Sequence, residues 1–351
     1  MPVIEVYVPR GSHMRSERVA ADAIPPECVW IDLTNPTREE EAAVEALCAL
    51  EVPTREEMRE IEVSSRLYSE DDADFMTASV VHGLDSGRPS FAPVTFILAG
   101  GRLVTLRYSE PKSFSIFAAK LCREINNHHR VIPVGGTDPV RPMTNGNGLE
   151  KPPTADQILI GLLETVVDRI ADLLETISAD LDRIGDDIFA ASDGTKPTGT
   201  AEFKRILRRI GAAGDLSSRV REGLATIDRL LPFLQLVLDR RKPTKEAKLR
   251  VKAMVRDITS LNDFVSFLSN KTTFLLDTTV GMISIEQNAI IKIFSVGAVA
   301  FMPPTLVASI YGMNFEHMPE LGWTFGYPYA LALMVLSAIV PLLFFRRKNW
   351  L

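Results

Sequence analysis

The chain has 351 residues, of which 46% are hydrophobic, and it carries a formal net charge of −6 at pH 7. This acidic balance argues against non-specific binding to nucleic acid, which needs a basic surface. The three cysteines, Cys28, Cys48 and Cys122, are scattered without C-x-x-C spacing. They are typical of reduced cytosolic thiols and argue against both a disulfide framework and a zinc site.

Residues 1–130 predict a cytosolic domain of mixed helices and strands (α+β) with a small mixed or antiparallel sheet. Strands are expected where apolar and β-branched residues alternate or cluster, at residues 28–33, 75–82, 94–99 and 103–107. Gly100-Gly101 separates the last two strands and is a two-residue hairpin signal. Helices are expected to begin at Thr37 and Thr54, because a Glu three positions later completes a capping box in each case. A further helix is expected at residues 111–126.

Residues 8–14 (Val-Pro-Arg-Gly-Ser-His-Met) admit two interpretations. They resemble the remnant of a thrombin site from an expression vector, which would carry no information about the fold. They equally fit a natural hairpin in which residues 3–8 form a strand and the chain turns at residues 9–12. The sequence leaves both interpretations open.

The chain after this domain is predicted to be helical, following a linker at residues 131–153 that is rich in Gly, Pro and Asn. Thr154 and Gln157 have capping-box spacing and begin a cytosolic helical hairpin at residues 154–244. The first helix of this hairpin is acidic and the second has a basic excess. We expect the two solvated faces to pair; alternatively, the acidic surface concentrates divalent cations near a pore mouth.

A stalk helix is predicted over residues 245–292, and no helix-breaking residue interrupts its continuation before Pro303-Pro304. A helix from residue 245 to residue 310 would be roughly 100 Å long at a rise of about 1.5 Å per residue. Such a helix would reach from deep in the cytosol to the outer face of a membrane. The two prolines are expected to bend it, which neighbouring helices tolerate in a bilayer.

Two long stretches without charged side chains lie near the C-terminus. Each is long enough to cross a bilayer as a helix, which needs about 20 mostly apolar residues. They predict transmembrane spans at residues 293–310 and 327–345, which are joined by a periplasmic loop at residues 311–326.

The charges beside these spans predict their orientation. The loop carries Glu316 and Glu320 but no Lys or Arg, whereas the tail at residues 346–351 carries two arginines and a lysine. The positive-inside rule therefore places the tail in the cytosol. Because two spans return the chain to the side on which it began, the N-terminal domain is predicted to be cytosolic as well.

Small and polar residues recur along the long helix in alternating steps of four and three. This polar stripe comprises Asp277, Gly281, Ser284, Asn288, Ile291, Ser295, Ala298, Met302, Thr305, Ser309 and Gly312. A spacing that averages 3.5 residues faces the axis of a left-handed bundle. The stripe therefore predicts either a close helix–helix contact or the lining of a pore, with Ile291 and Met302 as apolar constrictions.

Asp277 and Asn288 favour the pore, because a packing seam has little use for them and intramembrane polar residues usually mark ion paths. Two spans cannot enclose a pore, so a pore requires a homo-oligomer. An enzyme is not predicted, since the sequence shows no phosphate-binding glycine loop, nucleophile elbow or metal-ligand spacing. A membrane tether with a regulatory cytosolic domain is a further alternative.

A specific motif lies between the two spans. Tyr311-Gly312-Met313-Asn314-Phe315-Glu316 is followed by Met-Pro-Glu-Leu at residues 318–321. Together with residues 288–311 and the ending 345–351, this motif resembles the CorA family of divalent-cation transporters. Residues 29–33 (Val-Trp-Ile-Asp-Leu) and 70–72 (Glu-Asp-Asp) resemble the proteobacterial branch of that family.

The resemblance implies a funnel-shaped homopentameric channel in the bacterial inner membrane, with both termini in the cytosol. The first span would line the pore, the second would face lipid, and a cytosolic funnel would surround the stalk helices. Mg²⁺ is implied as the transported ion, with Co²⁺ and Ni²⁺ as alternates, and neither an organic cofactor nor a nucleic-acid partner is expected. The implied selectivity filter comprises Tyr311, Gly312, Met313 and Asn314.

The residues of this filter suit Mg²⁺, which gives up its water reluctantly. A ring of Asn314 carbonyls and backbone carbonyls near Gly312 would hold a hydrated ion without trapping it. The alternative is a proton-coupled Zn²⁺ transporter of the related ZntB-type branch, which usually varies this triplet or the residues after it. Met313, the following Met-Pro-Glu-Leu and the lack of a thiolate or histidine cluster on the stripe favour Mg²⁺.

The resemblance also implies closure by intracellular Mg²⁺, which would bridge an acid on the N-terminal domain to an acid on a neighbouring stalk. The candidates are Asp85, in the loop after His82-Gly83, and Asp257 or Asp263 on the stalk helix. Carboxylates held close together repel one another, and a divalent cation relieves that repulsion. The alternative interpretation is that all three are ordinary surface acids.

Overall fold

The computed structural model describes residues 4–10, 13–60, 62–122, 152–193, 200–313 and 322–348. The chain divides into two compact units. The first comprises Met1–Arg183 and Ile210–Thr272, and the second comprises Ile184–Arg209 and Thr273–Leu351. The helices are α1 (Arg38–Cys48), α2 (Val63–Arg66), α3 (Lys112–Leu121), α4 (Ala155–Asp193), α5 (Thr200–Arg240), α6 (Lys245–Tyr311) and α7 (Gly326–Arg347), with the 3₁₀ turns η1 (Ala21–Ala23) and η2 (Glu57–Arg59).

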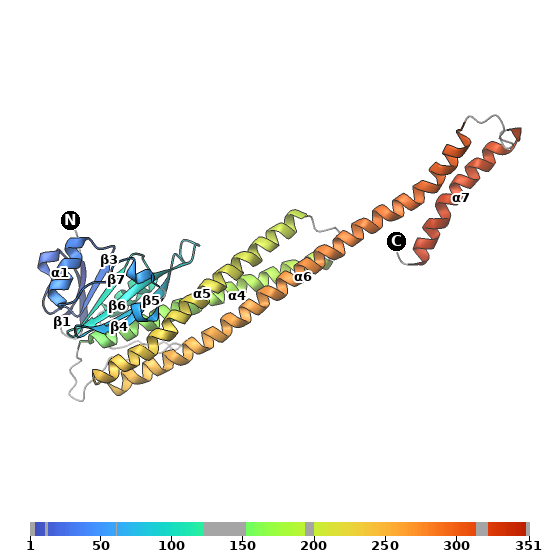
Figure 1. The fold of residues 1–351 in the computed structure, drawn as a ribbon. Coiled ribbons are helices and arrows are strands. Elements are labelled where there is room, and N and C mark those ends of the chain that lie inside the picture. Colours follow the sequence, from blue (N-terminus) through green and yellow to red (C-terminus); the bar gives the residue numbers. More distant parts are fainter. Residues whose placement is uncertain are drawn as a thin grey trace, which may run out of the picture. The chain divides into compact units, whose positions relative to one another are not determined.

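The first unit contains a seven-stranded sheet with the order β2-β1-β3-β7-β6-β5-β4 (Figure 1). Its strands are β1 (Ile4–Arg10), β2 (His13–Val19), β3 (Trp30–Thr34), β4 (Leu67–Glu70), β5 (Ala73–His82), β6 (Ser90–Ala99) and β7 (Arg102–Arg107). β3 and β7 pair in parallel, and the other neighbouring strands pair antiparallel. The expected mixed sheet is confirmed, but it is larger than expected because β1, β2 and β4 extend both edges.

The N-terminal segment forms the β1–β2 hairpin, in which Pro9 lies opposite Met14. The side chains of Val8 and Met14 are buried, and β1 also pairs with β3. These residues are therefore part of the sheet, which agrees with the hairpin interpretation of residues 8–14.

Different helices cover the two faces of the sheet. Successive strand residues point to opposite faces, so Ile31 of β3 joins Val44 of α1 in one core. Trp30 instead packs on the other face against Phe114 and Phe117 of α3. The connections that follow the parallel strands β3 and β7 thus pass to opposite faces, an arrangement that favours a crevice at the carboxyl ends of these strands.

The capping signals are confirmed at the starts of two helices. Thr37 N donates to Glu40 Oε2 (2.7 Å) and Glu40 N donates to Thr37 Oγ1 (3.4 Å) at the start of α1. Thr154 and Gln157 make the same exchange before α4. The box at Thr54 forms as well, but it begins the single 3₁₀ turn η2 rather than a longer helix.

The three long helices form as predicted. α4 and α5 correspond to the two helices of the expected hairpin, and α6 has 67 residues that include Pro303 and Pro304. α3 ends at Leu121, before the expected end at Asn126. Asn126 and most of the linker expected at residues 131–153 lie outside the described residues.

The sheet and α5 approach each other closely. A Cβ added to Gly223 of α5 would overlap the ring of Phe91 on β6. Nearby, Ser79 N of β5 donates to Thr226 Oγ1 of α5 (2.9 Å). Gly223 therefore allows α5 to pack against the sheet more closely than a larger residue would.

The acidic helix α4 pairs with basic residues, as its charge predicted. Arg209 Nη1 of α5 lies 2.6 Å from Asp187 Oδ2 in the second unit. In the first unit, the partner comes from α6, where Arg250 Nη2 lies 2.6 Å from Glu164 Oε2. The pairing thus extends beyond the expected hairpin to the stalk helix.

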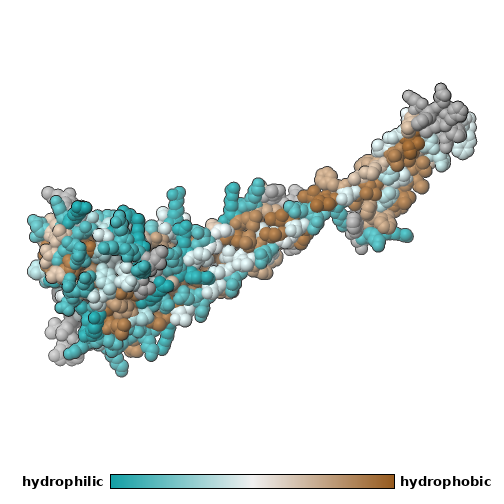
Figure 2. Space-filling view, in the orientation of Figure 1, coloured by the Kyte–Doolittle hydropathy of each residue, from teal (hydrophilic) through white to brown (hydrophobic). Residues whose placement is uncertain are grey.

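The second unit contains the apolar end of the chain. In Figure 2, hydrophobic residues dominate α7 and the C-terminal part of α6. Among the described residues, α6 and α7 are the two helices that are long and apolar enough to span a membrane. Within this unit, Val296 of α6 and Ala330 of α7 are buried, whereas most of their large apolar neighbours are exposed.

Candidate functional site

The polar stripe on α6 is exposed along its length, from Asp277 to Gly312. Ile291 and Met302 are 61% and 68% exposed although both are large and apolar. On the same helix Val296 is buried and Pro303 is half-buried, so the covered face of α6 differs from the stripe. Within the part of the chain that the structure describes, the stripe therefore has no packing partner.

Some hydroxyl groups on the stripe are satisfied within α6. Ser284 Oγ donates to Val280 O (3.0 Å), and Thr305 Oγ1 donates to Phe301 O (2.7 Å). Such bonds let a hydroxyl lie in a membrane helix without a partner from another helix. The stripe is therefore chemically suited to a wet lumen as well as to a packing seam.

Of the implied filter, Tyr311 is the last residue of α6, and Gly312 and Met313 follow it. Gly312 N donates to Ala308 O (3.0 Å), and Met313 N donates to Ile310 O (3.2 Å). A Cβ on Gly312 would lie 3.1 Å from Ala308 O. Asn314 lies outside the described residues, as do the acidic residues of the expected loop.

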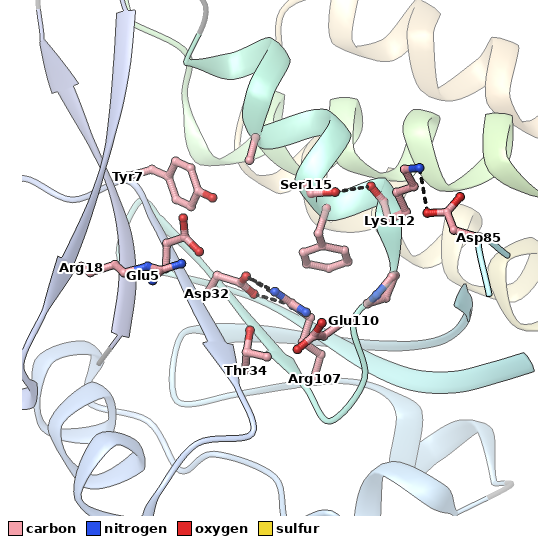
Figure 3. Close-up of a pocket in the computed structure, with 13 residues that line it drawn as sticks. Glu5, Tyr7, Arg18, Asp32, Thr34, Asp85, Arg107, Glu110, Lys112 and Ser115 are labelled. Carbon is pink, nitrogen blue, oxygen red and sulfur yellow. Dashed lines mark hydrogen bonds and ion pairs between the residues drawn. The ribbon is translucent and has the colours of Figure 1, made fainter. Parts of the chain in front are cut away.

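Asp85 lies between two cations of its own chain. Its Oδ2 is 2.7 Å from Lys112 Nζ (Figure 3), and its Oδ1 is 3.9 Å from Arg169 Nη2. Asp257 and Asp263 are exposed on α6. Within the part of the chain that the structure describes, no three His, Cys, Asp or Glu side chains are grouped to hold a metal ion. The implied metal bridge, from Asp85 to the stalk of a neighbouring protomer, stays a prediction.

A pocket of about 800 Å³ lies where β3 and β7 end (Figure 3). On its wall, Arg107 Nη2 lies 2.7 Å from Asp32 Oδ2, and both side chains are buried. Thr105 Oγ1 also donates to Asp32 Oδ1 (2.7 Å). Burial, with the nearby carboxylates of Glu5 and Asp32, raises the pKa of Tyr7 far above its ordinary value. The wall of the pocket is thus a fixed network of charged and polar groups.

Neither Asp32 nor Arg107 is among the candidate site residues that the sequence suggests, although Asp32 lies in the segment 29–33. The two residues are 75 positions apart, and only the parallel register of β3 and β7 brings them together. A signal was nevertheless present, because each is a charged residue in a largely apolar strand and a buried charge requires a partner.

The chain matches the family described as CorA-like Mg²⁺ transporter protein over residues 26–347. It is 35% identical to the magnesium transport protein CorA of Escherichia coli (strain K12) over 323 residues, which are 92% of each chain. The chain therefore belongs to the CorA family, whose members are transporters and channels rather than enzymes. The resemblance seen around the two spans is confirmed.

Two solved structures share the fold. The complete CorA magnesium transporter of Methanocaldococcus jannaschii aligns with a TM-score of 0.65 and 17% identity, over 100% of this chain and 99% of that one. The cytoplasmic domain of ZntB from Vibrio parahaemolyticus aligns with a TM-score of 0.55 and 12% identity, over 80% of this chain and 97% of that one. The fold shared with the complete transporter is an α+β N-terminal domain followed by long helices, of which α6 and α7 are the apolar ones, as in a membrane protein with a soluble N-terminal domain. The match to ZntB is to a cytoplasmic domain.

Proposed function

We propose that this chain is a Mg²⁺ channel that mediates influx of the ion down the membrane potential. The observation that carries the proposal is the 35% identity to a magnesium transport protein over 92% of both chains. The exposed polar stripe on α6 supports it, because an ion path needs such a face. Two charges that cross about 100 mV gain roughly 4.6 kcal/mol, so no coupled energy source is required.

The proposed assembly is a homopentamer in the inner membrane with both termini in the cytosol. Each protomer contributes its stripe to a central lumen, and rings of Ile291 and Met302 form narrow apolar constrictions. α7 faces lipid, which is supported by its exposed apolar side chains. The basic residues Arg346 and Arg347 in the last turn of α7 support the cytosolic position of the tail.

The proposed selectivity filter is the segment from Tyr311 to Asn314 at the outer end of the pore. Its neutral oxygens would hydrogen-bond a hydrated Mg²⁺ and release it again. Co²⁺ and Ni²⁺ are the proposed alternate ions. Intracellular Mg²⁺ is proposed to close the channel by bridging Asp85 to Asp257 or Asp263 of a neighbouring protomer.

Flux into proteoliposomes that contain the purified full chain tests this function. We expect Mg²⁺ entry that increases with an inside-negative potential, does not depend on a pH gradient and decreases when Co²⁺ or Ni²⁺ competes. No flux through the assembled protein would indicate a tether instead. Zn²⁺ entry that requires a proton gradient would indicate the zinc-transport alternative. The similarity to the ZntB domain, at 12% identity, supports a common fold alone.

A further inference from the structure

A second cavity, of about 190 Å³, lies at the first turn of α3 beneath the loop that joins β5 to β6. Its charged and polar lining includes His82, Asp85, Glu110, Lys112, Ser113 and Arg169. It shares Asp85, Glu110 and Lys112 with the 800 Å³ pocket at the ends of β3 and β7. The small cavity and the larger pocket therefore adjoin one another.

Two buried polar groups that belong to this lining have no hydrogen-bond partner among the described residues. Ser113 is 1% exposed, and its Oγ makes no hydrogen bond. Arg169 Nε is also buried and makes none, although Arg169 Nη1 donates to Asp172 Oδ2 (2.8 Å). Leaving such groups unpaired is costly, so nearly all of them have partners in folded proteins. Both residues line the cavity, so a partner from outside the chain can satisfy these covered groups by drawing the two side chains into it.

The same cavity lies at the N-terminus of α3, a helix of ten residues. Its N-cap is Pro111, and no side chain caps this end. Free N–H groups and the helix dipole make a helix N-terminus favourable for an anion. Lys112 and Arg169 add two positive charges, and the Ser113 hydroxyl adds a donor.

Asp85 already occupies part of this cationic environment. Gly83 (φ +74°) starts the tight loop that presents Asp85, and Arg88 N closes it by donating to Gly83 O (3.1 Å). The Asp85 side chain is 60% exposed, and exposed ion pairs contribute little to stability. An anion that enters the cavity can therefore take the place of the Asp85 carboxylate beside these cations.

We propose that this cavity binds a phosphate group, either free or carried by a nucleotide. Phosphate has enough acceptor oxygens for a guanidinium, an ammonium, a hydroxyl and a helix N-terminus at once. A cavity of about 190 Å³ holds one phosphate group, and the adjoining 800 Å³ has room for an organic remainder. The acids Asp85 and Glu110 would repel bare phosphate, but they suit a phosphate that carries Mg²⁺, which proteins commonly bind through one or two carboxylates.

Equilibrium dialysis of the full-length protein in detergent tests the proposal, with radiolabelled inorganic phosphate or ATP in a buffer that contains Mg²⁺. We expect saturable binding that Arg169→Gln and Ser113→Ala each weaken roughly tenfold, as the loss of one hydrogen bond to a charged ligand does. Because the Ser113 hydroxyl has no partner among the residues that the structure describes, Ser113→Ala should melt at the wild-type temperature or above. This separates a lost ligand contact from a damaged fold.

Matched controls come from exposed positions of α5. Arg219→Gln removes a guanidinium that pairs with Asp215, and Ser218→Ala removes a hydroxyl that bonds to Gly214 O. Both variants should bind phosphate as the wild type does. Tighter binding of ATP than of inorganic phosphate would support a nucleotide as the source, and equal affinity would support free phosphate.

The absence of saturable binding of either probe would overturn the proposal. So would binding that is unchanged in both Ser113→Ala and Arg169→Gln. Neither result depends on ion flux, so the proposal of Mg²⁺ transport stands or falls separately.

Discussion

At the residue scale, Tyr7 shows how the surroundings of a side chain set its chemistry. Its ring stacks on Trp30 with the ring centroids 4.0 Å apart. Its hydroxyl lies beside the carboxylates of Glu5 and Asp32 (Figure 3). Burial is the largest cause and these carboxylates add to it, so the pKa of Tyr7 rises far above the ordinary value of about 10.

This shift predicts a loss of stability in alkali. Above a pH of about 10, Tyr7 ionises in the unfolded chain but stays neutral in the folded one. The folded state then binds one proton more, and its stability falls as the pH rises towards the folded pKa. When the pH is raised from about 9 to 11, the melting temperature of Tyr7→Phe should therefore fall less than that of the wild type. Melting curves by circular dichroism measure this, with Tyr327→Phe at an exposed site as the control; equal losses in Tyr7→Phe and the wild type would contradict the account.

Asn314 is the residue on which proposed selectivity depends most. Asn314→Ala should abolish Mg²⁺ uptake in proteoliposomes while the oligomer still assembles, because the proposed ring loses its polar oxygens. Gly312→Ala should fail as well, since its Cβ would lie 3.1 Å from Ala308 O and crowd the end of α6. Gel filtration checks assembly in both variants, and normal uptake by Asn314→Ala with the wild-type metal preference would refute the role.

At the scale of elements, local signals predicted much of what forms. Capping boxes at Thr37 and Thr154 and helical periodicity on α6 involve residues only a few positions apart, so one segment is enough to reveal them. Strand neighbours are different, because β3 and β7 meet across a long stretch of chain and leave no local trace. The polar stripe was therefore predictable. The cavity at Ser113 was not, because β-strand ends, α3 and α4 form it only in the fold.

The same substitution at two glycines of α5 should change the melting temperature in opposite directions. Gly223→Ala should lower the melting temperature, because the new Cβ would overlap Phe91 and overpacking costs about 1–3 kcal/mol. Gly211→Ala, on the same helix and in the same unit, should raise it, because nothing lies within 4 Å and Ala is favoured over Gly in a helix by about 1 kcal/mol. Thermal unfolding of the detergent-solubilised protein compares them. A stabilised Gly223→Ala would show that the sheet and α5 do not meet closely.

The apolar constrictions on α6 can be tested one ring at a time. Met302→Ser should raise basal Mg²⁺ flux, because a polar ring no longer excludes water from the narrow point. Phe301→Ser changes the neighbouring residue, which is exposed but lies off the stripe, and it should not raise flux. Uptake is compared at equal amounts of protein per vesicle. An unchanged or lower flux through Met302→Ser would count against its position in the pore.

At the scale of the whole molecule, proposed regulation depends on competition for Asp85. Lys112 and Arg169 of the same chain already contact its carboxylate, so intracellular Mg²⁺ would have to displace them before bridging to Asp257 of a neighbour. Replacing Asp85 and Asp257 together with Asn should therefore weaken inhibition by internal Mg²⁺. It should also reduce the protection of the stalk from protease that Mg²⁺ provides.

A control for this double variant is Asp215→Asn with Asp239→Asn, which removes the same charge from exposed sites on α5. Both properties should be unaffected in that control. If the Asp85 and Asp257 variant also keeps wild-type inhibition and protection, these residues are not the sensor.

The tryptophans of this protein can serve as intrinsic fluorescent probes, because Trp30 is buried and Trp323 is exposed. Trp30 is fully buried and donates from Nε1 to Thr105 Oγ1 (3.0 Å), whereas Trp323, before α7, is 59% exposed. The third tryptophan, Trp350, lies outside the described residues. With Trp323 and Trp350 replaced by Phe, fluorescence would come from Trp30 alone and report the N-terminal domain. With Trp30 and Trp350 replaced, brominated lipids would quench Trp323 according to its depth, so each end of the chain could be followed without an attached dye.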